Sequence, residues 1–266
     1  MVIAIVPVGY HATSKGRVPE LYEVEGQSLL ERCVTNLIGA GIHEIVILVH
    51  TNEISEISRI ENTPEILDDE MIHKCREMRC ELSIWSATSL ESGVAEFSDS
   101  DIIVYWATDL WLSEGFEADV DRSGVHYNAA WQDYQARIHF LREMMLRIRQ
   151  PIACVETGVS WENALHSCAV SRSATGYIMG MLEPETCIPL PDTLDVIRTA
   201  ICIPAGTLMD LVPVEDECGR YPFQILIQQL ISHVPGILAV PETGRYFDAR
   251  IPAEFKAFLA SNGGFE

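Results

Sequence analysis

The sequence predicts an α/β protein with a mainly parallel, Rossmann-like sheet flanked by helices. Short apolar runs of strand length alternate with segments whose apolar residues recur at helical spacing, which is the order of successive βα units. Hydrophobic residues make up 48% of the chain and charged residues 21%, a composition typical of globular proteins. The 266 residues contain no linker or internal repeat, so we expect one domain spanning 1–266.

Strands and helices alternate regularly in the first half of the chain. Apolar residues at helical spacing predict a helix over 29–40, which is punctuated by Gly39 and Gly41. Crossover helices are expected at 64–79 and 89–97. The expected strands are 2–8, 44–50, 82–85 and 102–107.

The second half is less regular and is expected to add elements around the same sheet. A long helix is predicted over 131–149, with an apolar stripe formed by Tyr134, Ile138, Leu141, Met145 and Ile148. Two late helices are expected at 223–231 and 253–260. Shorter strands are expected at 152–155, 176–181 and 236–240.

The charge of the chain limits the class of partner. A formal net charge of −21 argues against binding to duplex nucleic acid, which requires clustered Lys and Arg. An anionic substrate then needs metal ions or a few local cations beside it. No run of eighteen apolar residues and no secretory signal occurs, which predicts a cytoplasmic protein without a membrane span. The sequence leaves the formation of a homo-oligomer open.

The loop after the first strand is a candidate phosphate-binding loop. A loop that leaves the carboxyl end of a parallel strand can direct backbone N–H groups at a phosphate, here from Val8 and Gly9 onward. Lys15 and Arg17 would add positive charge, and Gly16 would permit close approach of the backbone. The alternative is a plain connection between two elements, since the Gly-Lys-Ser/Thr order of a Walker loop is missing.

The residues that follow resemble a known family. The segment 19–32, PELYEVEGQSLLER, is similar to the nucleotidyltransferase segment in which Pro-Lys, a short hairpin and Gly-Lys-Pro-Leu-Leu lead into a helix. The segment 39–49, GAGIHEIVILV, resembles the second unit of that family. The resemblance implies a fold of the nucleotide-diphospho-sugar transferase (GT-A) type, with a nucleotide-binding half over 1–110 and an acceptor-binding half over 111–266.

Two aspartates match the positions at which this family binds catalytic magnesium. Asp109 follows the fourth expected strand in DIIVYWATD, and Asp248 precedes the last helix in GRYFDARIPAEF. Magnesium is usually held by one or two carboxylates together with substrate phosphates. The resemblance therefore implies Mg²⁺ as cofactor, with Asp109 and Asp248 as its ligands. Each aspartate taken alone could instead be a turn or helix-capping residue.

The implied reaction is transfer of a nucleotidyl group from a nucleoside triphosphate to a small phosphorylated metabolite, with release of pyrophosphate. Lys15 and Arg17 are the expected catalytic cations, which would stabilise the leaving pyrophosphate. Glu20 departs from the pattern because the family carries Lys there. Two alternatives stay open: a GT-A glycosyltransferase that uses a nucleotide sugar, and a nucleotide-binding or assembly module without catalysis.

Overall fold

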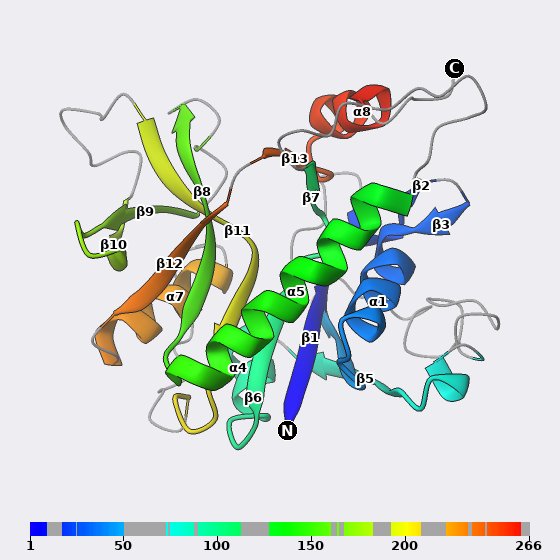
Figure 1. The fold of residues 1–266 in the computed structure, drawn as a ribbon, viewed down its shortest axis with the longest axis horizontal. Coiled ribbons are helices and arrows are strands. Elements are labelled where there is room, and N and C mark those ends of the chain that lie inside the picture. Colours follow the sequence, from blue (N-terminus) through cyan, green and yellow to red (C-terminus); the bar gives the residue numbers. More distant parts are fainter. Residues whose placement is uncertain are drawn as a thin grey trace.

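A computed structural model describes residues 1–9, 18–24, 26–50, 73, 75–87, 90–112, 128–160, 164, 168–182, 193–208, 222–233, 236–242 and 244–261. Within these residues, nine strands form one mixed sheet in the order β5-β4-β1-β6-β11-β8-β12-β10-β9 (Figure 1). The strands are β1 (Val2–Val8), β4 (Glu44–His50), β5 (Glu81–Ala87), β6 (Asp101–Tyr105), β8 (Ile152–Ser160), β9 (Cys168–Arg172), β10 (Tyr177–Met181), β11 (Thr193–Ile203) and β12 (Ile237–Glu242).

The first half of the sheet is parallel, as the sequence predicts. β1 pairs in parallel with both β4 and β6, and β4 pairs in parallel with β5. The predicted bounds of β1 and β4 match the observed ones, because both strands are continuous apolar runs buried on both faces. The carboxyl ends of these strands therefore lie along one edge of the sheet, where ligands bind in open α/β folds.

The second half corrects the expectation of a mainly parallel, Rossmann-like sheet. β11 runs antiparallel to β6 and to β8, and β10 runs antiparallel to β12 and to β9. A further pairing of β11 with β9 closes β11, β8, β12, β10 and β9 into a five-stranded barrel. No strand is predicted at β11, because a bulge with two polar residues, Arg198 and Thr199, interrupts its apolar run.

Helices cover both faces of the sheet. α1 (Leu29–Gly39) and α5 (Asn128–Ile148) pack together on one face, and α4 (Leu90–Ala95) and α7 (Pro222–His233) lie on the other (Figure 1). Each face has its own apolar core, built on alternate residues of the central strands. Four residues of the predicted stripe on α5 are buried, but Ile148 is 37% exposed at the end of the helix. The crossover helix expected at 64–79 lies mostly outside the described residues.

Small elements stand at the carboxyl edge of the parallel strands. β7 (Asp109–Leu112) and β13 (Arg245–Asp248) form a two-stranded ribbon, which leads into α8 (Pro252–Ser261) (Figure 1). A short helix η1 (Pro19–Leu21) and the hairpin of β2 (Glu23–Val24) and β3 (Gln27–Ser28) precede α1. None of the helices in the described part of the chain is long and apolar enough to cross a membrane.

The start of α1 provides a test of the local fold. The Ser28 hydroxyl accepts from the Glu31 N–H at 3.1 Å, and the Glu31 carboxylate accepts from the Ser28 N–H at 2.7 Å, which forms a capping box.

Ser28→Ala should lower the free energy of unfolding by about 1 kcal/mol in urea denaturation. Ser261→Ala, at the exposed end of α8, should change it by less than about 0.5 kcal/mol. Equal effects of the two substitutions would contradict the cap.

Candidate functional site

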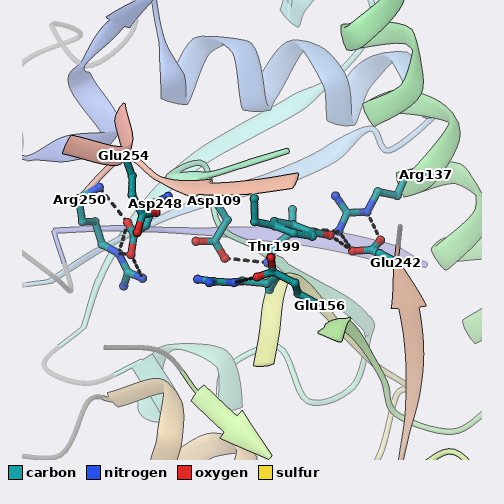
Figure 2. A network of polar contacts seen from close by, with 10 residues as sticks. Asp109, Arg137, Glu156, Thr199, Glu242, Asp248, Arg250 and Glu254 are labelled. Carbon is teal, nitrogen blue, oxygen red and sulfur yellow. Dashed lines mark hydrogen bonds and ion pairs between the residues drawn. The ribbon is translucent and has the colours of Figure 1, made fainter. Parts of the chain in front are cut away.

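Asp109 and Asp248 lie directly opposite each other. β7 and β13 pair antiparallel, and their register places these two residues as partners across the ribbon (Figure 2). Both aspartates are buried, with exposed fractions of 9% and 3%. β7 begins a few residues after the buried strand β6, so the ribbon holds both carboxyl groups at the carboxyl edge of the parallel strands. The structure thus brings together two acids that are 139 positions apart in the sequence (248 − 109).

An arginine is already bound to Asp248. The Arg250 side chain donates from Nε at 2.7 Å and from Nη2 at 2.6 Å to the two carboxylate oxygens, and its backbone N–H donates at 2.8 Å. Glu254, in the first turn of α8, accepts from the Asp248 backbone N–H at 2.6 Å and fixes the turn. Burial by itself lowers the pKa of Arg250, but the hydrogen bonds and charge interaction with Asp248 outweigh it and raise that pKa above its ordinary value. The pair is therefore a strong charge-assisted contact.

Asp109 is positioned by the bulge of β11. Its Oδ2 accepts from the Thr199 backbone N–H at 2.7 Å. Burial raises the pKa of Asp109, and the guanidinium groups of Arg250 and Arg198 oppose that increase. Arg198 itself donates from Nε to Glu156 at 2.9 Å. The two arginines thus partly neutralise the opposed aspartates.

Thr199 joins the site to a second buried polar cluster. Its backbone has φ 58°, a left-handed conformation that is strained for a β-branched residue, and it is fully buried. Arg137 on α5 donates to the Thr199 hydroxyl at 3.1 Å and also binds Glu242 and the Tyr246 hydroxyl (Figure 2). These contacts fix the backbone conformation of the bulge, so the Thr199 N–H is held toward Asp109.

Glu20, in η1, is a buried acid that interacts electrostatically with Arg250 and Asp248. It is 3% exposed, and its Oε2 has no hydrogen-bond partner among the described residues. Its carboxyl group accepts from its own backbone N–H and from that of Gly9, and it interacts electrostatically with Arg250 and Asp248. Burial raises the pKa of Glu20 to about 7, although the backbone donors and Arg250 oppose the increase. The Glu20 carboxyl group therefore interacts with the backbone N–H of Gly9, in the expected phosphate-binding loop.

The two aspartates can supply only part of the coordination shell of a magnesium ion. No group of three or more His, Cys, Asp or Glu side chains in the described ranges is arranged to hold a metal ion by itself. Two opposed carboxylates are a sufficient protein contribution to a magnesium site, because substrate phosphates and water supply the remaining oxygens. Carboxyl groups also outnumber guanidinium groups here, so an anionic ligand needs an added cation. In this structure, Arg250 engages both carboxylate oxygens of Asp248.

The sequence-predicted site residues fall into two groups. Asp109 and Asp248 meet, and Val8 and Gly9 end β1 on the same edge, with Gly9 in a left-handed conformation at φ 79°. The expected cations Lys15 and Arg17, with Gly16, lie outside the described residues, so their roles stay predictions. No sequence pattern pointed to the residues around the aspartates, which are Arg198, Thr199 and Arg250, or to Arg137 and Glu242 in the adjoining cluster.

Known structures share this fold. A UDP-glucose pyrophosphorylase complexed with UDP-glucose superposes with a TM-score of 0.64 at 16% identity, over 99% of this chain and 98% of that one. The corresponding enzyme of Acinetobacter baumannii gives 0.63 at 15%, over 97% and 92%. A putative glucose-1-phosphate thymidylyltransferase of Bacillus anthracis gives 0.61 at 9%, over 98% and 93%. No protein-family model and no curated protein sequence matches the chain.

The likeness confirms the expected resemblance at the level of the fold. These neighbours are sugar-phosphate nucleotidyltransferases, and they match along nearly the whole chain at low identity. The mixed α/β fold of this chain is therefore one that these neighbours share. The expectation from residues 19–49 that the chain has this fold is correct, although its sheet is less parallel than predicted.

The burial of Glu20 predicts a pH-dependent cost to stability. Because its pKa rises from 4.5 in the unfolded chain to about 7 in the folded protein, the folded state binds more protons between these values. Stability should therefore fall as pH rises from 4.5 to 7, by about 3 kcal/mol. Glu20→Gln removes this cost, so its gain in unfolding free energy over the original chain should be about 3 kcal/mol larger at pH 8 than at pH 4.

Urea denaturation at the two pH values measures this difference. Glu23→Gln is the matched control, because Glu23 is an exposed carboxyl in the adjacent hairpin. A gain for Glu20→Gln that does not change with pH would contradict the burial of an ionisable Glu20.

The contact between Thr199 and Arg137 gives a second prediction. Thr199→Val keeps the backbone N–H and the branched shape but removes the acceptor of a buried guanidinium donor. Thr199→Ser keeps the hydroxyl. The valine variant should be less stable than the serine variant by about 1–2 kcal/mol, as measured by chemical denaturation. Equal stability of the two variants would show that Arg137 does not depend on this hydroxyl.

Proposed function

We propose that this chain is a magnesium-dependent nucleotidyltransferase that transfers a nucleotidyl group from a nucleoside triphosphate to a sugar phosphate. The opposition of Asp109 and Asp248 across β7 and β13 is the observation that carries the proposal. Both are buried acids at the carboxyl edge of a parallel half-sheet, next to the end of β1. The neighbours of the same fold include proteins bound to UTP and to UDP-glucose, which supports a nucleotide and a sugar phosphate as substrates.

The reaction needs alignment and charge neutralisation more than a protein nucleophile. A phosphate oxygen of the acceptor forms a bond to the α-phosphorus of the triphosphate. The bond from that phosphorus to the β-bridging oxygen breaks, and pyrophosphate leaves with the electron pair. Holding the two anionic reactants in line supplies much of the rate enhancement in such a transfer.

The described residues contribute fixed charge to this step. Asp109 and Asp248 would hold magnesium, which lowers the charge on the phosphate oxygens when it is bound. The Thr199 backbone N–H keeps Asp109 in one orientation. Arg198 lies close enough to raise the positive potential at both aspartates, which favours an anionic substrate. Lys15 and Arg17 are proposed to meet the leaving pyrophosphate.

A binding function without catalysis is the second candidate. It is favoured by Glu20, whose buried carboxyl group interacts with the Gly9 N–H, and by Arg250, which forms an ion pair with Asp248. Such a module would bind a nucleotide and release no pyrophosphate. A glycosyltransferase is not favoured, because the compared structures of this fold are nucleotidyltransferases.

Pyrophosphate release over a panel of triphosphates and sugar 1-phosphates tests the proposal. With magnesium present, UTP or dTTP with glucose 1-phosphate should give pyrophosphate, and chelation of the metal should abolish it. Asp109→Ala and Asp248→Asn should each lower kcat/KM by at least about a hundredfold, because each removes a proposed metal ligand.

Asp195→Asn is the matched control for these variants. Asp195 pairs with Arg172 between β11 and β9, away from the ribbon, and its substitution removes the same charge. It should leave turnover within about twofold of the original chain. Full activity of Asp109→Ala would refute the metal role. Nucleotide binding without pyrophosphate from any substrate pair would favour the second candidate.

A further inference from the structure

Arg250 holds the position at Asp248 where a cation would bind. Its Nε lies 2.7 Å from Oδ1 and 2.9 Å from Oδ2, and its Nη2 lies 2.6 Å from Oδ2. Both carboxylate oxygens are thus engaged by a positively charged donor. A divalent ion at these oxygens would be repelled by the guanidinium group and would have to share its acceptors. Binding of a metal to Asp248 and binding of Arg250 to Asp248 are therefore expected to compete.

Glu20 offers Arg250 a second acceptor inside the site. Its Oε2 is buried and has no hydrogen-bond partner among the residues that the structure describes. The Gly9 N–H and the Glu20 N–H hold the carboxyl group in place. Arg250 exerts the largest opposite-charge effect on Glu20, and Arg250 in turn is influenced by Asp248, Asp109 and Glu20. A buried carboxylate oxygen without a donor is costly, so a partner is expected in another state of the site.

We propose that Arg250 is an exchangeable internal cation: it occupies Asp248 while no divalent ion is bound, and it moves to Glu20 when an ion binds at Asp109 and Asp248. This inference rests on the proposed function, since it takes the two aspartates as the metal ligands. It assigns a role to Glu20, which the proposed reaction does not use. Arg250 and Glu20 are positioning residues in this scheme, because they act through Asp248.

The exchange leaves each buried carboxylate beside a positive charge. Asp248 loses a guanidinium partner and gains an ion, and Glu20 gains the guanidinium that Asp248 releases. A buried carboxylate or arginine without an opposite charge is unfavourable in proteins. Without Glu20, the displaced Arg250 would have no buried partner within the described site. Ion binding should then become weaker.

Binding of Mn²⁺ in the absence of nucleotide tests the exchange independently of turnover. Free Mn²⁺ is measured by electron paramagnetic resonance at pH 8 for the original chain, Arg250→Gln, Glu20→Gln and the double variant. Arg250→Gln should bind Mn²⁺ about tenfold more tightly, because the competing guanidinium is gone. Glu20→Gln should bind it several-fold more weakly. In the double variant, the Glu20→Gln substitution should add less than a twofold effect to that of Arg250→Gln.

Two controls complete the cycle. Arg172→Gln removes a guanidinium from another Arg–Asp pair, with Nε 2.8 Å from Asp195 outside the site, and should leave Mn²⁺ affinity unchanged. Asp248→Asn should lose the site. Melting temperatures of all variants establish that each is folded under the conditions of the binding experiment.

The outcomes separate this inference from the proposed function. Equal Mn²⁺ affinity of the original chain and Arg250→Gln would overturn the exchange and leave the metal site intact. An equal effect of Glu20→Gln in both backgrounds would also overturn it, because Glu20 would then act on the ion by its charge alone. Absence of Mn²⁺ binding from every variant would overturn the inference and the proposed metal ligands together.

Discussion

The pairing of β7 with β13 is the constraint on which the rest of the site depends. The register of this short ribbon places Asp109 opposite Asp248, both buried. Two buried carboxylates in such surroundings repel each other, so cations beside the ribbon stabilise it. Arg250 and Arg198 are those cations in this structure, and each is in turn balanced by a further carboxylate. Acidic and basic side chains thus alternate through the site.

A second group of polar contacts, deeper in the fold, holds the ribbon and its charge pairs in place. Arg137 reaches from α5 to Glu242 on β12, to Tyr246 on β13 and to Thr199 on β11. It therefore ties the ribbon to the barrel and to the helical layer at one point. The Arg137–Glu242 pair is almost completely buried, and separating it would leave a buried charge without its partner, which favours the observed arrangement.

Several features could be predicted from the sequence because they depend on local patterns. The apolar runs at β1 and β4 gave their bounds, and the order of acids in the chain pointed to Asp109 and Asp248. The partners of those acids could not be read in the same way. Thr199 approaches Asp109 through a backbone N–H, which carries no sequence signal, and Arg198 looks like a polar break in an apolar run. Arg250 lies two residues after Asp248, and nothing in the sequence indicates that their side chains form a pair. Glu20 could be recognised only as an acid at a position where the family carries Lys.

The central strand β11 has a mechanical consequence. Over its eleven residues it is hydrogen-bonded to β6 of the parallel half and to β8 and β9 of the barrel. One strand therefore belongs to both halves, and its bulge lies between the part paired with β6 and the part paired with β9. A rotation of one half against the other would have to bend β11 at this bulge, where Thr199 contacts Asp109. The geometry of the aspartates is thus linked to the angle between the two halves of the sheet.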